Sequence, residues 1–366
     1  MRVLTVNVGS SSVKLSLVDD GDRLAAAATL PAGSDRIDED AVAGVVAAQV
    51  GIEAVGHRIV HGGPALRAPV LVDRHVRLQL DALVDLAPLH LPRSLAGLDL
   101  VGRLLPDVPV VACFDTAFHA TLPPAASTYA LPAEWRSRWA LRRYGFHGLS
   151  HAWAARRAAE LTGRPAADVR VVTCHLGAGA SLAAVASGRS VDTTMGFTPL
   201  EGLVMATRSG TVDPGLVLWL EEHAGLPAGE LASALEHRSG LLGLAGSADM
   251  RTVLAEEAAG DEDAAVAVAV YLHRLRAGIC AMAAAMGGLD ALAFTGGVGE
   301  RAPAIRSRAA AGLGFLGIFL DEDANAGAQP DQELSAPGSP VRSFVVTARE
   351  DLQMAHEVRS VLGAAS

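Results

Sequence analysis

Lysine is nearly absent from this sequence. Lys14 is the only one, and all other cationic residues are arginine. Acidic residues outnumber basic ones by 40 to 30, so the formal net charge is −10. A surface of this sign does not attract nucleic acid or anionic membranes, and a chain that handles anionic substrates must gather positive charge locally. We therefore interpret Lys14, which follows a Gly-Ser loop, as a functional residue rather than an ordinary solvated lysine.

Cysteine is also scarce. Cys113, Cys174 and Cys280 are widely spaced, and each lies in an apolar run. An odd number of scattered cysteines is typical of buried, reduced thiols in a cytosolic protein. No cluster of Cys and His has the spacing of zinc ligands, so we expect no zinc site.

The sequence shows neither a signal peptide nor a membrane span. Residues 1–10 run directly into a strand pattern, which predicts a cytoplasmic protein. The apolar stretch from Ala264 to Phe294 contains charged residues such as Arg274 and Asp290. We therefore expect a buried helix followed by a strand in this stretch.

A weak internal repeat predicts two domains of common architecture. With 366 residues, half of them hydrophobic, the chain exceeds one ordinary core. Alternating apolar residues predict a β-hairpin over 4–17 and a similar unit over 171–185. Aligning the two units places Asn7 opposite His175 and Gly9 opposite Gly177. The predicted fold class is α/β.

Further elements follow from local patterns. We expect strands over 108–114, 289–295 and 341–347, helices over 151–161 and after Pro303, a surface loop over 321–339, and a final amphipathic helix. The first of these strands ends at Asp115. We expect the final helix to pack back on the N-terminal domain.

Three glycine turns could bind phosphate. They lie at 9–12, 177–179 and 296–299, and glycine lets backbone N–H groups approach phosphate closely. None is a Walker A loop, and Gly297-Val298-Gly299 lacks the third glycine of a dinucleotide fingerprint. For each turn alone, a tight hairpin is the more common explanation. Together they favour a nucleotide bound in a cleft.

Histidine and arginine are concentrated in short segments. Arg58 lies between His57 and His61, and Arg208 lies in a long irregular stretch after residue 190. Long irregular stretches within compact domains are usually functional. Arg58 and Arg208 are candidates for an anion clamp, because guanidinium groups bind carboxylate and phosphate oxygens bidentately. The alternative for each is a salt bridge that ties down a loop.

These segments together resemble the acetate kinase family of acetate and propionate kinases. The matching segments, in family order, are N-V-G-S-S-S-V-K at 7–14, G-H-R-I-V-H-G-G at 56–63, L-A-P-L-H at 86–90, F-D-T-A-F-H at 114–119, R-R-Y-G-F-H-G-L-S-H at 142–151, C-H-L-G-A-G-A-S at 174–181, V-D-T-T-M-G-F-T-P-L-E-G at 191–202, T-R-S-G at 207–210 and F-T-G-G-V-G-E at 294–300. They extend over nearly the whole chain, and the run at 191–202 is highly specific.

The resemblance implies an actin/hexokinase/Hsp70-like fold, with two duplicated actin-like (ribonuclease H-like) ATPase domains around a central cleft. The expected domains are 1–118 plus 353–366 and 119–352. The resemblance also implies ATP and ADP as substrates, Mg²⁺ or Mn²⁺ as cofactor, and a homodimer that binds neither nucleic acid nor a membrane. The implied activity is reversible in-line transfer of the ATP γ-phosphoryl group to acetate.

The resemblance also assigns residues to roles. The catalytic residues would be Asp115, Arg58, His147, Arg208 and His90, and the metal site would include Asn7 and Glu350. The phosphate-binding residues would be Ser10, Ser12, Lys14, His175, Gly177 and Gly179. The nucleotide-binding residues would be Asp249, Met250, Arg251, Gly296, Gly297, Gly299, Glu300 and Arg306. The acyl pocket would be formed by Val60, Leu89, Phe146 and Pro199.

The chemistry of these roles is coherent. A carboxylate is already a nucleophile, so catalysis consists mainly of alignment and charge neutralisation. We therefore expect Asp115 to orient an arginine or polarise the site rather than to accept a proton.

Several positions depart from the family pattern. Leu91 follows L-A-P-L-H where the family has Asn, and Arg301 follows Gly-Glu where the family has Asn. Ala178 also replaces an Asn, which removes a side-chain donor near the phosphates. The sequence leaves two alternatives open. One is a kinase that prefers propionate or butyrate, and the other is a nucleotide-binding regulator with weakened catalysis.

Overall fold

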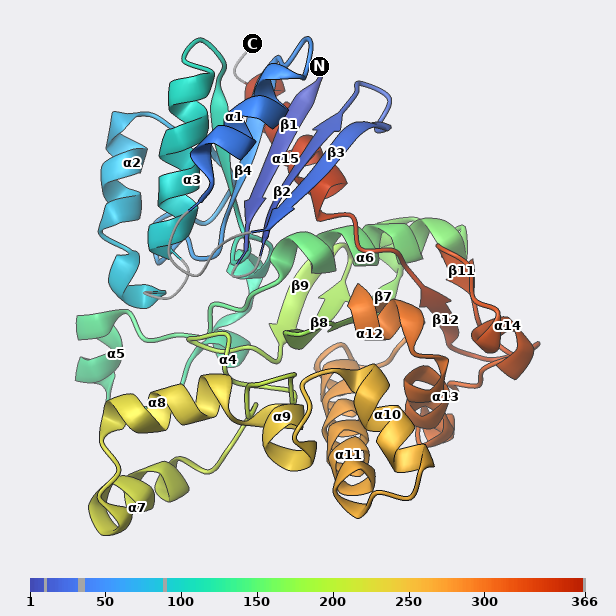
Figure 1. The fold of residues 1–366 in the computed structure, drawn as a ribbon. Coiled ribbons are helices and arrows are strands. Elements are labelled where there is room, and N and C mark those ends of the chain that lie inside the picture. The colour runs from blue at the N-terminus through green and yellow to red at the C-terminus, as the bar shows by residue number, and fades with distance from the viewer. Residues whose placement is uncertain (10–11, 32–36, 88–90, 365–366) are drawn as a thin grey trace. The chain divides into compact units, whose positions relative to one another are not determined.

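The computed structural model describes residues 1–9, 12–31, 37–87 and 91–364 (Figure 1). The chain divides into two compact units. The first unit comprises Met1–Ala120, Phe146–Trp153 and Arg349–Ser366, and the second comprises Thr121–Gly145 and Ala154–Ala348. The C-terminal segment therefore returns to the first unit, as expected for the final helix.

The first unit is built on a six-stranded mixed sheet with the order β3-β2-β1-β4-β6-β5. Its strands are β1 (Val3–Val8), β2 (Ser12–Val18), β3 (Leu24–Pro31), β4 (Ala54–Ile59), β5 (Val70–Leu71) and β6 (Val110–Phe114). Strands β1, β4 and β6 are parallel, and the other pairs are antiparallel. The predicted hairpin is confirmed, with Val8 paired to Val13 across its turn.

Two helical layers cover this sheet (Figure 1). Alternate residues such as Leu4 and Val6 pack on one face with side chains of α1 (Glu39–Ala47) and α3 (Leu91–Leu104). The opposite face packs against Met354 and Val358 of α15 (Glu350–Ala364). Successive strand residues point to opposite faces, so one strand supplies both cores. The remaining first-unit helices are α2 (Arg74–Asp81), η1 (Val84–Leu86) and η2 (Phe118–Thr121), and α6 (Gly148–Thr162) begins there.

The second unit repeats the strand order of the first. Its sheet has the order β11-β12-β10-β7-β8-β9, which matches the first sheet when each strand number is raised by six. Its strands are β7 (Arg170–Leu176), β8 (Ala180–Ala186), β9 (Arg189–Thr193), β10 (Ala291–Thr295), β11 (Gln332–Glu333) and β12 (Arg342–Val345). Strands β7, β10 and β12 are parallel. The predicted α/β class with duplicated halves is confirmed.

In both first hairpins of the repeat, the backbone N–H of a glycine closes the turn. Gly9 N donates to Ser12 O over 2.8 Å, and Gly177 N donates to Gly179 O over 3.0 Å. The two aligned glycines thus lie at the same place, directly after β1 and β7, although the two turns differ in length.

Helices surround the second sheet. They are α4 (Pro124–Ser127), α5 (Ala133–Trp139), α7 (Pro214–Ala224), α8 (Ala228–His237), α9 (Gly240–Ala245), α10 (Met250–Ala258), α11 (Glu262–Ala285), α12 (Gly296–Arg301), α13 (Pro303–Ala311) and α14 (Glu322–Ala326), with short turns η3 (Ala166–Asp168) and η4 (Gly314–Leu316). Helix α11 is long and apolar enough to cross a membrane by length and composition. Its buried residues nevertheless recur at helical spacing, from Ala264 through Val268, Leu272 and Leu275 to Ile279. This stripe is typical of a core helix, and the expected helix-then-strand is confirmed by α11 and β10.

One expected loop contains regular structure. The segment 321–339 forms helix α14 and strand β11 in addition to turns. The Asp321 side chain accepts a hydrogen bond from Ala324 N over 2.9 Å, so it caps a short helix. Glycine and proline content indicated irregular backbone, but a single capping carboxylate was enough to start a helical turn.

We expect the second-unit core to be sensitive to truncation at Phe344, which is fully buried in β12. Phe344→Ala should lower the free energy of unfolding by about 3–5 kcal/mol, because it removes buried apolar surface and leaves a cavity. Phe315 is 76% exposed, so Phe315→Ala should change stability by less than about 0.5 kcal/mol. Urea denaturation of both variants checks this, and equal losses would contradict the assigned core.

Candidate active site

Polar side chains gather at the carboxyl edge of the parallel strands in the first unit. Asn7 is the penultimate residue of β1, Arg58 is the penultimate residue of β4, and Asp115 directly follows β6. The strand periodicity places all three on the face that α15 covers, and Glu350 opens that helix. Ligands of α/β sheets bind at this edge, so the topology identifies a candidate site.

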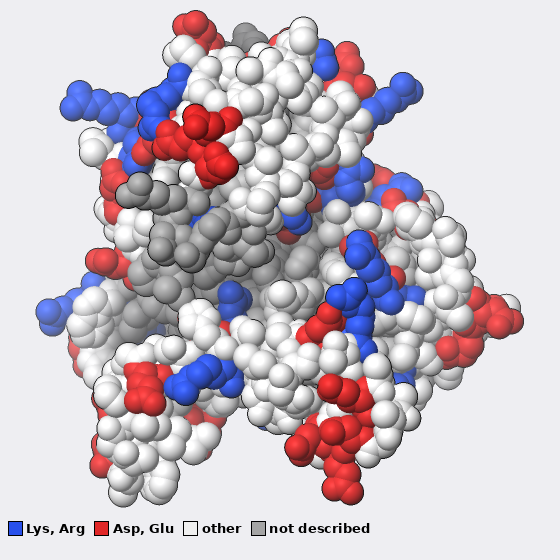
Figure 2. All heavy atoms as spheres, viewed as in Figure 1, with Lys and Arg blue, Asp and Glu red and all other residues white. Residues whose placement is uncertain are grey.

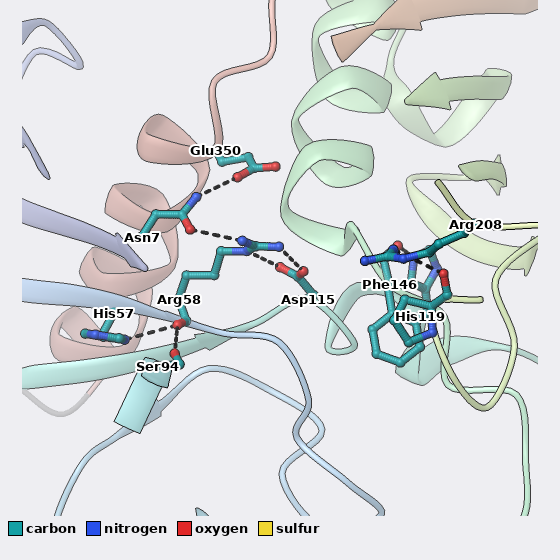
Figure 3. A network of polar contacts seen from close by, with 10 residues as sticks. Asn7, His57, Arg58, Ser94, Asp115, His119, Phe146, Arg208 and Glu350 are labelled. Atoms are coloured by element: carbon teal, nitrogen blue, oxygen red, sulfur yellow. Dashed lines mark hydrogen bonds and ion pairs between the residues drawn. The ribbon is translucent and has the colours of Figure 1, made fainter. Parts of the chain in front are cut away.

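These four residues form one hydrogen-bonded network (Figure 3). Arg58 Nε donates to Asp115 Oδ1 over 2.8 Å, and Arg58 Nη2 donates to Asp115 Oδ2. Arg58 Nη1 donates to Asn7 Oδ1 over 3.0 Å, and Asn7 Nδ2 donates to Glu350 Oε2 over 3.1 Å. The sequence predicted each residue separately, and the fold joins residues 343 positions apart.

The Arg58–Asp115 ion pair is largely buried. The Asp115 side chain is 2% exposed and that of Arg58 is 17% exposed. Burial by itself would lower the pKa of Arg58, but the adjacent Asp115 carboxylate outweighs burial and raises it. The guanidinium is therefore always charged. Both Asp115 oxygens accept from Arg58, so this carboxylate is arranged to orient a cation.

The backbone of Arg58 is held by two residues that the sequence did not identify. Ser94 Oγ donates to Arg58 O over 2.8 Å, and the His57 ring nitrogen Nδ1 lies 3.1 Å from the same oxygen. His57 is fully buried, and burial lowers its pKa to about 4. A neutral imidazole with its proton on Nδ1 can donate to this carbonyl. Ser94 carries no motif, so only the packing of α3 on β4 reveals its role.

A strained turn follows in the segment 145–148. His147 has a φ of +57°, a left-handed conformation that non-glycine residues seldom adopt. Gly148 N donates to Asp115 O over 2.8 Å, and a Cβ at this position would lie 2.2 Å from that oxygen. The turn that carries His147 is therefore attached to the residue that orients Arg58. Strain of this kind is concentrated at functional sites.

Phe146 is enclosed by histidines. His119 Nε2 lies 3.0 Å from Phe146 O, and the His61 ring contacts the Phe146 ring edge-on with centroids 5.4 Å apart. Burial lowers the pKa of both His61 and His119 to about 4, so both are neutral near pH 7. Phe146 is buried, as is Val60, which suits both for an apolar pocket. His61 and His119 are thus packing and hydrogen-bonding groups in this structure.

A cavity of about 570 Å³ occupies the second unit. Its lining includes five residues predicted from the sequence to bind phosphate or nucleotide, namely Gly177, Asp249, Met250, Arg251 and Gly297. Pockets of about 300–1,000 Å³ hold drug-sized ligands, so a nucleotide is of suitable size. Other lining residues were not predicted, among them Ala206, Leu241, Leu254, Tyr271 and Val298.

The charged residues of this cavity differ in their partners. Asp249 caps α10 and its carboxylate pairs with Arg251, whose hydrogen bond lowers the pKa of Asp249 to about 2. Arg301 also lines the cavity and is exposed. It was noted in the sequence as a departure rather than as a site residue. The cavity therefore has an additional guanidinium, and Ala178, the position that lacks a side-chain donor, lines the same cavity.

Other predicted nucleotide residues lie behind the cavity lining. Arg306 is 1% exposed and donates to Asn325 Oδ1, Gly299 O and Glu300 O over 2.8–2.9 Å. Glu300 Oε1 accepts from Gly296 N and from Ala348 N, each over 3.0 Å. These bonds shape helix α12, whose Gly297 and Val298 line the cavity. A role in supporting the cavity wall fits this burial better than direct contact.

The remaining predicted residues are dispersed. Arg208 is half-buried in the second unit, where Nη1 donates to Pro199 O over 3.3 Å and burial lowers its pKa. Lys14 is exposed on β2 directly opposite Asn7, on the same face of the sheet. Ser12 begins β2. His175 is the penultimate residue of β7, which precedes the turn that contains Gly179. The predicted residues Ser10, Leu89 and His90 lie outside the described residues.

Comparisons with known proteins agree with one another. The acetokinase family model matches residues 21–356. The chain is 45% identical to an acetate kinase of Deinococcus deserti, with 100% of this chain and 98% of that protein covered, and 44% identical to one of Leifsonia xyli subsp. xyli, with 99% of each covered. The crystal structure of Porphyromonas gingivalis acetate kinase matches with a TM-score of 0.90 at 35% identity over 99% of both chains. A propionate kinase structure from Francisella tularensis subsp. tularensis matches with a TM-score of 0.91 at 32% identity, covering 98% of this chain and 99% of that one.

The buried His57 predicts a pH dependence of stability. Its pKa is about 4 in the folded chain and 6.5 for an ordinary histidine, so the unfolded chain binds more protons between these values. The free energy of unfolding should therefore fall as the pH falls from 6.5 to 4, by roughly 3 kcal/mol for this residue. Urea denaturation across this range should show a shallower decline for His57→Gln. His75→Gln, which changes an exposed residue, should keep the wild-type slope. An unchanged slope in His57→Gln would contradict the argument.

Proposed function

The chain belongs to the acetokinase family and transfers the γ-phosphoryl group of ATP reversibly to the carboxylate of acetate, and we propose that the Arg58 network serves the acyl side of this reaction. The observation that carries the proposal is the bidentate Arg58–Asp115 pair at the carboxyl edge of the sheet. Its guanidinium is fixed in direction and keeps its charge. Such a group is suited to neutralise phosphoryl or carboxylate oxygens.

The chemical step needs alignment more than proton transfer. The acetate carboxylate attacks phosphorus in line with the leaving ADP oxygen, and negative charge spreads over the equatorial phosphoryl oxygens. We assign Arg58, His147 and Arg208 to these oxygens, with His90 nearby. Asp115 acts by orienting Arg58, because both of its oxygens already accept from that side chain. It is not required to accept a proton.

The nucleotide belongs in the second-unit cavity. Gly177 and Gly297 expose backbone without a Cβ, which lets phosphate approach. Arg251 and Arg301 supply positive charge at the lining, and Leu254, Tyr271 and Val298 supply apolar surface. This combination of apolar walls with a few charged groups is typical of a cofactor or substrate pocket.

The residues also fit a magnesium ion, for which manganese could substitute. The Asn7 amide and the Glu350 carboxylate offer oxygen ligands, and their hydrogen bond keeps them adjacent. Across residues 1–9, 12–31, 37–87 and 91–364, no group of three or more His, Cys, Asp and Glu could enclose a metal. Mg²⁺ typically uses one or two protein oxygens together with water and substrate phosphates. When bound, it would neutralise phosphoryl charge.

The acyl group is small. Val60 and Phe146 are buried apolar side chains of the first unit, and we assign them to the pocket for the acetate methyl, together with Leu89 and Pro199. Acetate is the substrate that the family comparisons support. A preference for propionate is the alternative, and one methylene in an apolar pocket changes kcat/KM by only about 10–200-fold.

We further propose a cytoplasmic homodimer. Leu216, Leu218 and Trp219 of α7 are 49–56% exposed, and α7 contains no buried residue. Exposed apolar groups of this kind mark contact surfaces, and a second copy would cover them. Nucleic acid is not an expected partner. On the face shown in Figure 2, Lys and Arg side chains occur in small groups among acidic and neutral ones.

Activity assays of arginine variants test the site. With acetate, ATP and Mg²⁺, the wild-type protein should form acetyl phosphate that hydroxylamine traps, and EDTA should abolish this. Arg58→Ala and Arg208→Ala should each lower kcat by about 10²–10⁵, because each removes charge that stabilises the transition state. Arg74→Ala and Arg274→Ala change exposed arginines and should retain activity. Full activity of Arg208→Ala would overturn the assignment.

The oligomeric state tests the role of α7. Trp219→Glu should shift the protein from dimer to monomer in light scattering coupled to gel filtration, because a buried unpaired carboxylate opposes association. Phe315→Glu introduces the same charge at another exposed aromatic residue and should leave the dimer intact. A wild-type monomer, or a dimeric Trp219→Glu, would refute this surface.

A further inference from the structure

A half-buried polar cluster lies beside the loop that carries Pro199 and Arg208. Tyr129 precedes α5, and Arg143 follows it. The Tyr129 hydroxyl donates to Glu201 Oε2 over 2.6 Å, and Arg143 Nη2 donates to Glu201 Oε1 over 2.8 Å. The Glu201 carboxylate therefore joins two side chains that lie before the loop in the sequence. We call Tyr129, Arg143 and Glu201 the loop cluster.

The loop cluster binds the loop backbone at several points. Phe197 N donates to the Tyr129 hydroxyl over 2.9 Å. Arg143 Nη1 donates to Thr194 O and Met195 O, each over 3.1 Å. One guanidinium and one phenol thus satisfy three backbone groups on either side of Gly196. An irregular loop has few backbone partners of its own, so these bonds set its conformation.

Gly196 shows how closely the cluster fits the loop. A Cβ at this position would lie 1.7 Å from Glu201 Oε2 and 2.2 Å from the Tyr129 hydroxyl. Tyr144 N and Gly145 N also donate to Gly196 O over 3.0 and 3.2 Å. The loop backbone is therefore pressed directly against the carboxylate and the phenol. The carboxylate and the hydroxyl leave no space for a side chain at Gly196.

The bound segment leads directly to the two predicted substrate residues. Pro199 lies two residues before Glu201, and its carbonyl oxygen accepts from Arg208 Nη1 over 3.3 Å. The backbone also turns back at Arg208, where Met205 N donates to Arg208 O over 3.1 Å. The position of Glu201 thus determines that of Pro199, and Pro199 in turn contacts Arg208.

The surroundings of Tyr129 keep its hydroxyl protonated. Burial raises the pKa of Tyr129, and the neighbouring Glu201 raises it further, so the hydroxyl remains a donor. The Arg143–Glu201 pair is 18% and 32% exposed, so it is only partly screened. Charge-assisted hydrogen bonds of this kind hold their geometry more firmly than neutral ones.

We propose that Tyr129, Arg143 and Glu201 are positioning residues that set the acyl-chain selectivity of the enzyme by fixing the loop that carries Pro199 and Arg208. This inference rests on the proposed function, in which Pro199 borders the acyl methyl. A pocket that rejects one extra methylene needs its wall fixed to a fraction of an ångström. A loop freed from the cluster can retreat and admit a longer chain.

Tyr129→Phe is the sharpest test, because it removes only the hydroxyl. The ratio of kcat/KM for acetate to that for propionate should fall by about fivefold or more, while KM for ATP changes less than about twofold. Tyr144→Phe is the matched control. It removes a hydroxyl that donates to Ala140 O, outside the 194–208 loop, and should leave the ratio unchanged. An unchanged ratio in Tyr129→Phe, or equal rises in KM for both substrates, would overturn the proposal.

Two further variants keep the test decisive if Tyr129→Phe does not fold. Glu201→Gln preserves an acceptor for Tyr129 but loses the charge that pairs with Arg143, so the ratio should fall by a smaller factor. Arg143→Lys keeps the charge but cannot reach Glu201, Thr194 and Met195 together, and should resemble Tyr129→Phe. A lowered melting temperature with an unchanged ratio in these variants would assign the cluster a purely structural role.

The outcome can be separated from that of the proposed function. Arg208→Ala tests whether the loop takes part in the reaction at all. If Arg208→Ala is inactive and the cluster variants keep the wild-type ratio, only the selectivity proposal fails. If Arg208→Ala is fully active, the proposed function fails first, whatever the ratio.

Discussion

The bidentate pair between Arg58 and Asp115 is the interaction on which the first-unit site depends. Burying the Arg58 guanidinium without a partner would cost desolvation free energy. The Asp115 carboxylate offsets this cost and fixes the direction of the guanidinium. The same aspartate accepts Gly148 N through its backbone, so the His147 turn is tied to it as well. Asn7 extends the network to Glu350. One acidic residue thus holds both the Arg58 guanidinium and the turn that carries His147.

The two sheets share one strand order but carry different residues at the carboxyl edge of their parallel strands. In each unit the carboxyl ends of three parallel strands form an edge where side chains and turns meet. The first unit places charged side chains at this edge, on β4 and after β6. The second unit places glycine turns there and opens a cavity beside α12. Duplicated backbone thus carries a network of charged side chains at one sheet edge and a glycine-lined cavity in the other unit.

Sequence motifs predicted candidate ligand-binding residues, and they did not predict the residues that support them. Arg58 and Asp115 lie in recognisable segments, and the structure joins them. Ser94, which donates a hydrogen bond to the Arg58 backbone, lies in no motif. Any small hydrogen-bond donor at this position of α3 could bind the same carbonyl oxygen. The loop cluster was missed for a different reason. Arg143 and Glu201 lie in quoted motif segments but were assigned no role, and Tyr129 lies outside these segments. Tyr129 and Glu201 are 72 positions apart, and only the folded chain brings their oxygens to 2.6 Å.

The sequence by itself determined the α/β class, the duplication, the glycine turns and the family to which the chain belongs. These follow from local alternation of apolar residues and from short motifs, which depend on neighbours in the chain. Only the tertiary structure decided the partners of these residues. Arg306 is buried behind a cavity wall, both Asp115 oxygens accept hydrogen bonds from Arg58, and Glu201 binds the side chains that hold the loop before Arg208. Burial and partner choice depend on long-range packing, and no local pattern encodes them.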